Sequence, residues 1–219
     1  MPLAVAVYCS SSENVGQEYF AEARSLGKLI ATHGHSLVYG GCAIGLMGEV
    51  ARAVSQNGGR VLGVIPETIH SKGLAFDGCH ELMVTPSMHE RKLAMEERAD
   101  AYVALPGGFG TLEEFVQVLT LKSLHYHRKP IVLINLNGFY DPLLHLFNHF
   151  VEHKFARKEI VELYKVVAHS GEVIPYLEAY EAPAELPKWF ERQGYGARGQ
   201  GTVRVRAATT FARNRESVM

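Results

Sequence analysis

Short apolar runs without helical periodicity alternate along this chain with stretches whose apolar residues recur at helical spacing. The apolar runs predict buried strands, and the stretches between them predict helices. The predicted strands are residues 3–9, 36–39, 61–65, 81–85, 101–105, 131–135 and 166–168. The predicted helices are residues 19–30, 46–56, 88–98, 112–124 and 140–153, with a last helix beginning near Glu172. This alternation predicts an α/β fold, a single doubly wound, mostly parallel, Rossmann-like sheet with helices on both faces.

The composition excludes several classes of protein. The 219 residues include 23 acidic and 22 basic ones, so no overall positive field favours nucleic acid or an anionic membrane. No apolar run approaches the roughly 18 residues that cross a bilayer, and the N-terminus lacks the basic flank of a signal peptide. Three cysteines without a C-x-x-C pair suit a reducing compartment, so we expect a cytoplasmic protein.

The end of the chain differs from everything before it. Residues 195–219 hold five arginines against a single glutamate and offer few aliphatic side chains for burial. We therefore expect one Rossmann-like domain over residues 1–194, followed by a basic, flexible tail over residues 195–219. A short strand at 202–206 and an anion-binding arm are the alternatives for this tail.

Two glycine-rich segments stand between a predicted strand and a predicted helix, where doubly wound sheets bind ligands. Residues 40–48 lack the G-x-G-x-x-G spacing of a dinucleotide site, and both a tight packing turn and a nucleotide contact stay open for them. Residues 107–110 hold three glycines directly before a helix, whose N-terminus attracts anions. No Walker lysine follows, so a single phosphate suits this segment better than a triphosphate.

Charged residues lie close to the second glycine segment. Thr111 and Glu114 have the spacing of a capping box, so Glu114 is either a helix cap or a catalytic carboxylate. Glu113 has no comparable structural explanation, and two acids repel a phosphate unless a cation stands nearby. Arg91 and Lys92, in the first turns of the preceding predicted helix, are candidates for that cation. The alternative is that both are solvated surface residues.

Two separated motifs resemble the Lonely Guy (LOG) family: Met-His-Glu-Arg-Lys at 88–92 and Pro-Gly-Gly-Phe-Gly-Thr-Leu-Glu-Glu at 106–114. The resemblance covers roughly residues 3–180 and includes the segments 39–48, 63–66 and 138–142. Members are cytokinin riboside 5′-monophosphate phosphoribohydrolases, long labelled possible lysine decarboxylases. The resemblance implies hydrolysis of the N-glycosidic bond of an adenosine 5′-monophosphate, often N6-prenylated, to free base and ribose 5-phosphate. It implies no cofactor and no metal.

Residue by residue, the resemblance assigns the catalytic pair to Arg91 and Glu114. A carboxylate can stabilise the oxocarbenium character of the ribose while it orients or deprotonates water, and we assign that role to Glu114. Arg91 can clamp the phosphate or compensate negative charge near the departing base. The matching substrate-contacting positions are Ser11, Gly41, Met88, Lys92, Gly107, Gly108, Phe109, Gly110, Thr111, Leu112, Glu113 and Thr120. The partners implied are a small-molecule nucleotide and a second copy of the chain, in a homodimer or larger homo-oligomer, with no nucleic acid and no membrane.

Two positions depart from the family pattern, and two other functions stay open. Ser10 replaces a glycine, and Gly73 stands where members often have a glutamate that contacts the substrate, so both affect base preference. A non-catalytic nucleotide or molybdenum-cofactor carrier of the same fold would not need the Arg91–Glu114 pair. Lysine decarboxylation would need a lysine in Schiff-base linkage to pyridoxal phosphate, and only Lys92 and Lys122 lie near these elements.

Eleven histidines raise the question of a metal site. His145, His149 and His153 recur on one face of a predicted helix, but no acidic partners can be placed beside them. We expect a solvated or interfacial stripe and no metal.

Overall fold

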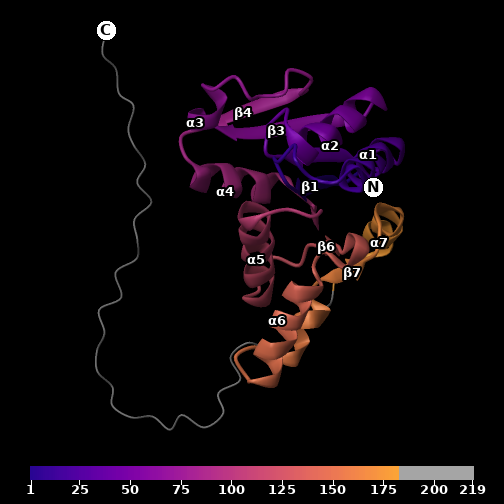
Figure 1. Ribbon diagram of the computed structural model, residues 1–219, viewed down its shortest axis with the longest axis vertical. Coiled ribbons are helices and arrows are strands. Elements are labelled where there is room, and N and C mark those ends of the chain that lie inside the picture. Colours follow the sequence, from indigo (N-terminus) through magenta and orange to yellow (C-terminus); the bar gives the residue numbers. More distant parts are fainter. Residues whose placement is uncertain (183–219) are drawn as a thin grey trace, which may run out of the picture. The chain divides into compact units, whose positions relative to one another are not determined.

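The computed structural model describes residues 1–182, and within them seven parallel strands form one sheet in the order β4-β3-β2-β1-β5-β6-β7 (Figure 1). The strands are β1 (Ala4–Tyr8), β2 (Ser36–Tyr39), β3 (Arg60–Pro66), β4 (Glu81–Thr85), β5 (Ala101–Ala104), β6 (Ile131–Ile134) and β7 (Lys165–Val167). The α-helices are α1 (Gln17–Thr32), α2 (Gly45–Gln56), α3 (Glu67–His70), α4 (Met88–Arg98), α5 (Phe109–Ser123), α6 (Asp141–Glu152) and α7 (Val173–Ala179). Short 3-10 turns occupy Leu136–Gly138, Lys158–Glu162 and Ser170–Glu172.

The predicted α/β fold is confirmed, and the differences concern the ends of elements. Strands β2 and β4 and helix α4 have the predicted bounds. Helix α5 begins at Phe109 rather than at 112, because the N-cap is Gly108 and not Thr111. Periodicity does not predict α3, which is too short to show a helical repeat. The predicted tail, residues 195–219, lies outside the described residues.

The order of the strands creates a crevice at the middle of the sheet. The chain builds outward from β1 through β2 and β3 to β4, and then returns so that β5 pairs with the other side of β1. Val7 of β1 consequently lies between Tyr39 of β2 and Val103 of β5. The connections after β1 and β5 run to opposite faces of the sheet. They leave a crevice between them at the carboxyl ends of these strands, where doubly wound sheets bind ligands.

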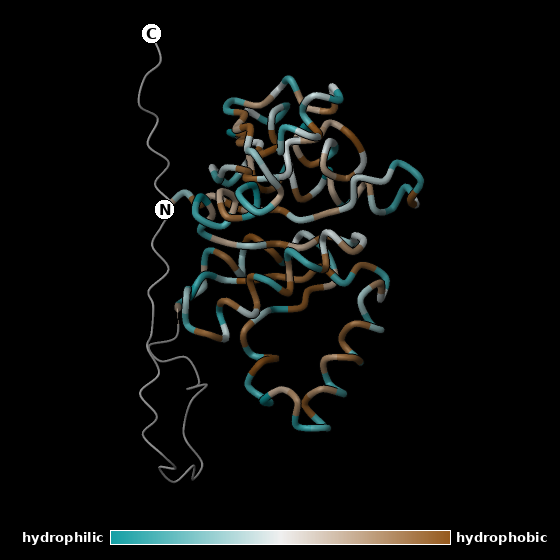
Figure 2. The backbone as a smooth tube through the Cα atoms, turned by 90° about the vertical axis from the view of Figure 1, so that its left-hand side faces the viewer, coloured by the Kyte–Doolittle hydropathy of each residue, from teal (hydrophilic) through white to brown (hydrophobic). Residues whose placement is uncertain are grey.

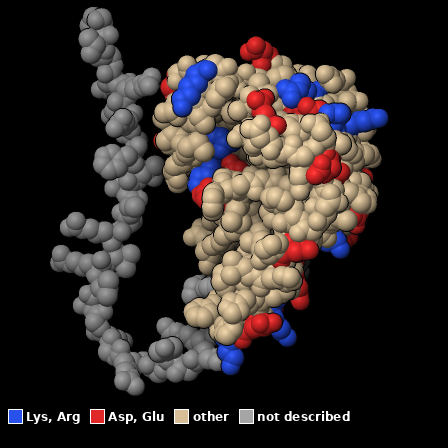
Figure 3. Space-filling model, viewed as in Figure 1, with Lys and Arg blue, Asp and Glu red and all other residues tan. Residues whose placement is uncertain are grey.

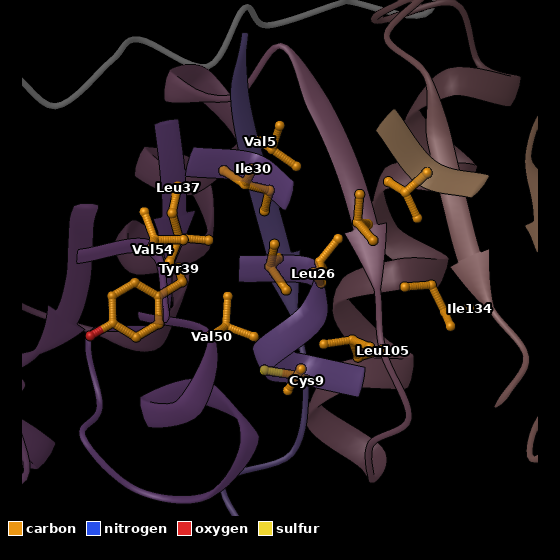
Figure 4. Packing of buried hydrophobic residues seen from close by; sticks show 14 of the residues in the cluster. Val5, Cys9, Leu26, Ile30, Leu37, Tyr39, Val50, Val54, Leu105 and Ile134 are labelled. Atoms are coloured by element: carbon orange, nitrogen blue, oxygen red, sulfur yellow. The ribbon is translucent and has the colours of Figure 1, made fainter. Parts of the chain in front are cut away.

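Two apolar layers cover the sheet. On one face, Val5 packs with Leu26 of α1 and Leu37 of β2, together with side chains of α2 and α7 (Figure 4). On the other face, Met95 of α4 and Phe115 of α5 are buried against the strands, and α6 adds further apolar side chains. Because both faces are covered, the strands read as continuous apolar runs instead of alternating ones.

The helices are amphipathic. In Figure 2, hydrophobic and hydrophilic stretches alternate along the helical parts of the tube, as expected for helices with one buried face. Within residues 1–182, none of the helices combines the length and the apolar character that a membrane span needs.

Candidate active site

A pocket of about 400 Å³ lies beyond the carboxyl ends of β1, β2 and β5. The loops after β1 and β2, together with α3 and the first turns of α4 and α5, form its walls. Its lining residues are Cys9, Ser10, Ser11, Ser12, Gly40, Cys42, Met47, Ile69, Met88, Arg91, Gly108, Phe109, Gly110, Thr111 and Glu114. Both glycine segments therefore contribute to one pocket at the crevice of the sheet.

An ion pair between α4 and α5 stands in the wall of this pocket. Arg91 Nη1 donates to Glu114 Oε1 at 2.7 Å, and the two side chains are 7% and 11% exposed. Arg91 Nε also donates to the carbonyl oxygen of Val64 at 3.1 Å. A buried guanidinium donates to a carboxylate in a fixed geometry, so the contact with Arg91 fixes the orientation of the Glu114 side chain in the pocket.

The local sequence explains why Arg91 points there. Ser87 is the N-cap of α4, and its hydroxyl accepts from the backbone N–H groups of His89 and Glu90 at 3.2 and 3.3 Å. The predicted capping arrangement thus fixes where α4 starts and places Arg91 in its first turns. Gly40 provides the space: a Cβ there would lie 2.0 Å from Arg91 Nη2.

The alternative reading of Glu114 as a helix cap is wrong. Gly108 is the N-cap of α5, so Thr111 and Glu114 both lie inside the helix. The carboxylate of Glu114 accepts from Arg91 and not from the start of its own helix. The predicted neighbourhood of acids and cations is confirmed by this pair and by a second one between Lys92 and Glu113.

Burial dominates the ionisation of Glu114. Removal from water raises its pKa above the usual carboxyl value, although the Arg91 guanidinium acts in the opposite direction. Cys9, which also lines the pocket, is buried, and the same desolvation raises the pKa of its thiol well above the usual range. Glu114 is thereby a better proton acceptor than an exposed glutamate, whereas Cys9 stays a neutral thiol.

The N-terminus of α5 offers an anion site in the same pocket. The Leu112 N–H makes the first bond of the helix, to the Gly108 carbonyl at 3.0 Å, so the N–H groups of residues 109–111 precede the ladder. A Cβ at Gly108 or Gly110 would meet nothing within 4 Å. The open glycine backbone and the positive helix end together suit one phosphate group.

The remaining sequence-predicted contacts fall into three places. Ser11 and Met88 line the pocket with the glycines, Phe109 and Thr111. Gly107 and Leu112 line a neighbouring pocket of about 250 Å³ with Phe109 and Tyr140. Lys92 and Glu113 pair with each other, Gly41 is buried behind Gly40, and Thr120 is exposed farther along α5.

Sequence reasoning did not single out Ser12 and Ile69, which both line the pocket. Gly40 and Met47 also line it, and they belong to the segment 40–48, for which a nucleotide contact stayed open. The signal for that segment was its position between a strand and a helix. Ile69 gives no such signal, because α3 has only four residues and no periodicity.

The predicted histidine stripe lies on exposed positions of α6 and its C-cap. His149 and His153 have ring centroids 4.1 Å apart. Within the described part of the chain, no three His, Cys, Asp or Glu side chains come together as a metal site requires. Lys122 is buried in α5 and donates to the Tyr180 hydroxyl at 3.1 Å, away from the pocket lining.

Comparisons with known proteins show which family the chain resembles. The family model described as "Possible lysine decarboxylase" matches residues 47–177. Cytokinin riboside 5′-monophosphate phosphoribohydrolase LOG of Oryza sativa subsp. japonica is 39% identical over 182 residues, which are 83% of this chain and 75% of the relative. Cytokinin riboside 5′-monophosphate phosphoribohydrolase LOG5 of Arabidopsis thaliana is 38% identical over 177 residues, which are 81% of this chain and 78% of the relative.

Solved structures support the fold. A molybdenum cofactor carrier protein from Chlamydomonas reinhardtii superposes with a TM-score of 0.61 at 24% identity, over 81% of this chain and 96% of that one. The molybdenum cofactor binding protein of Rippkaea orientalis gives a TM-score of 0.63 at 20% identity, over 81% and 97%. At this identity the likeness concerns the arrangement of strands and helices alone.

Proposed function

The chain belongs to the Lonely Guy (LOG) family of cytokinin riboside 5′-monophosphate phosphoribohydrolases, and we propose that it hydrolyses the N-glycosidic bond of an N6-modified adenosine 5′-monophosphate. The products are the free base and ribose 5-phosphate. The observation that carries the proposal is the buried Arg91–Glu114 pair beside an open anion site. A carrier needs the anion site but has no use for a buried carboxylate of raised pKa.

The phosphate end of the substrate determines how it lies. Backbone N–H groups at the start of α5 hold the 5′-phosphate, and the open positions at Gly108 and Gly110 let it approach closely. The ribose then lies along the first turns of α5, on the side where Glu114 enters the pocket. A nucleoside lacks this anchor, so it is a poor substrate.

Glu114 and Arg91 divide the chemistry. As the bond between C1′ and the base nitrogen breaks, the ribose gains oxocarbenium character, which the Glu114 carboxylate stabilises. Glu114 accepts a proton from the attacking water, and the hydroxyl adds to C1′. The base leaves with the bonding electron pair and takes a proton from solvent, and Glu114 then releases its own proton to solvent. Arg91 orients Glu114 through Nη1 and is anchored by Val64 through Nε, so Nη2 is free to donate to the nucleotide.

Lysine decarboxylation does not suit the site. Within residues 1–182, no lysine lines the pocket. Lys92 pairs with Glu113, and Lys122 is buried elsewhere in α5. A Schiff-base lysine must reach its cofactor in the pocket, and neither does.

We further propose a homodimer that acts in the cytoplasm. Apolar side chains are exposed on and after α5 and on α6, among them Leu124, Tyr126, Leu146 and Phe150. On the face shown in Figure 3, few charged side chains lie over α5, as an interface between copies would require. Three free cysteines agree with a reducing compartment. Light scattering of the purified chain measures the assembly.

Chromatography of the reaction products tests the proposal. Purified protein is incubated with AMP, N6-isopentenyl-AMP and the two matching nucleosides, and free base and ribose 5-phosphate are measured. Release from the monophosphates and not from the nucleosides supports the phosphoribohydrolase. Nucleotide binding without release contradicts it and leaves the carrier.

A further inference from the structure

The second ion pair between α4 and α5 differs from the first in where it points. Lys92 Nζ donates to Glu113 Oε1, and the side chains are 17% and 54% exposed, but neither residue lines the pocket. Lys92 follows Arg91 in α4, and Glu113 precedes Glu114 in α5. Consecutive residues of a helix point about 100° apart, so the Arg91–Glu114 pair faces the pocket and the Lys92–Glu113 pair lies to the side of it.

The outer pair continues into a seam between the two helices. One turn farther along each helix, Gln117 Nε2 donates to Glu96 Oε1. Glu96 lies on the same face of α4 as Lys92, and Gln117 lies on the same face of α5 as Glu113, because residues four apart are neighbours on a helix surface. Figure 3 shows basic and acidic side chains adjoining in the area of α4. Lys92 and Glu113 thus belong to the contact between α4 and α5.

We propose that Lys92 and Glu113 are positioning residues: their ion pair holds the first turns of α4 and α5 in register, so that Arg91 and Glu114 keep their contact. The inference rests on the proposed function of that inner pair. It departs from the nucleotide contacts that the family resemblance implies for Lys92 and Glu113. Without the outer pair, the Arg91–Glu114 and Glu96–Gln117 contacts would remain between these turns of α4 and α5, and the catalytic carboxylate would be held less firmly.

The charges around Glu114 agree with this role. Glu113 raises the pKa of Glu114 and Lys92 lowers it, so the two charges of an intact pair oppose each other, whereas the loss of one member leaves the other unopposed. Arg91 lowers the same pKa, and the buried Tyr8 and Cys9 also face Glu114. The loss of either charge therefore shifts the pH dependence of turnover, which the loss of an ion pair remote from Glu114 would not do.

Steady-state kinetics with N6-isopentenyl-AMP test the proposal on three variants: Lys92→Met, Glu113→Gln, and the reversed pair Lys92→Glu with Glu113→Lys. We expect each single variant to lower kcat about tenfold and to leave KM within about threefold. The acid limb of the kcat profile should move to higher pH in Lys92→Met and to lower pH in Glu113→Gln. The reversed pair should return kcat to within about threefold of the unmodified protein.

Arg98→Met is the matched control. Arg98 lies on the same helix and pairs with Glu81 at 2.7 Å, with both side chains 38% exposed, but it is absent from the pocket lining. We expect kcat and KM within about twofold of the unmodified protein and no shift of the pH profile. All the variants should melt within about 2 °C of the unmodified protein, because exposed ion pairs add little to stability.

A direct role of Lys92 in binding gives a different pattern. If Lys92→Met raises KM more than about tenfold at unchanged kcat, and the reversed pair does no better, the positioning role is overturned. If the unmodified protein releases no base, the proposed function is wrong. Calorimetry with AMP then tests separately whether Lys92 contacts the nucleotide. An AMP affinity of Lys92→Met within about threefold supports positioning, and a loss beyond about tenfold overturns it.

Discussion

The two glycine-rich segments border the same pocket but use glycine for opposite purposes. After β2, a Cβ at Gly40 would lie 2.0 Å from Arg91 Nη2, at Gly45 it would lie 2.4 Å from the backbone of Ser11, and at Gly48 1.9 Å from the Ala43 carbonyl oxygen. At the start of α5, a Cβ at Gly108 or Gly110 would meet nothing within 4 Å. The first segment is glycine-rich because protein atoms fill the space. In the second segment Thr111 crowds Gly107, but the space beside Gly108 and Gly110 is left open.

This difference separates packing from ligand binding within a single site. In the loop after β2 the backbone lies close to Arg91, so the glycines there determine how the protein atoms pack around the pocket. The turn into α5 exposes backbone N–H groups, so the glycines there determine how closely a ligand can approach. Substitutions in the two segments should therefore affect different properties.

The largest effect on stability should come from Gly48→Ala. The added methyl group would collide with the backbone carbonyl of Ala43, which cannot move without shifting the start of α2. We expect a loss of about 3 kcal/mol in the free energy of unfolding. Denaturant titration measures it, and a loss below about 1 kcal/mol would show that the loop after β2 is looser than its contacts imply.

Gly40→Ala should affect activity more than stability. Its methyl group would displace the guanidinium of Arg91, which then loses its bonds to Val64 and Glu114. We expect kcat/KM to fall about 100-fold while the free energy of unfolding changes by only about 1–2 kcal/mol. Kinetics within about threefold of the unmodified protein would mean that the position of Nη2 is unimportant for turnover.

Gly110→Ala should change stability and binding in opposite directions. Alanine is the better helix former, so α5 gains up to about 1 kcal/mol, whereas the methyl group enters the pocket and weakens AMP binding about tenfold. Thermal melting and calorimetry with AMP measure the two effects. Unchanged AMP affinity would place the phosphate away from the start of α5.

The smallest expected effect is a shift in pH dependence. Burial raises the pKa of Glu114, and only the ionised carboxylate accepts a proton, so kcat should rise with pH through an ionisation above the usual value of about 4.3 for glutamate. The same shift has the opposite sign for stability: the protonated form is favoured at low pH, and that contribution fades as pH rises through the folded-state pKa. A carboxyl group with a raised pKa titrates between about pH 4 and about pH 8. A pH–rate profile that is flat over this range would exclude Glu114 as the base.

The fold could be predicted in large part because its signals are local. The apolar runs of β2 and β4 and the Ser87 cap of α4 determine their own boundaries. Site geometry depends on contacts between distant segments, and the spacing of Thr111 and Glu114 allowed two readings. Only the N-cap at Gly108 and the contact of Glu114 with Arg91, 23 positions away, exclude the helix cap. The contribution of Ile69 could not be predicted at all, because a four-residue helix leaves no pattern.

Turnover and AMP binding measured on one variant, Glu114→Gln, test the central claim most directly. The amide keeps the shape of the side chain and removes its ability to accept a proton. We expect base release to fall about a thousandfold while AMP affinity stays within about threefold, because the proposed phosphate site is the backbone at the start of α5. Base release within about tenfold of the unmodified protein would contradict the account, since Glu114 would then be no more than a partner of Arg91.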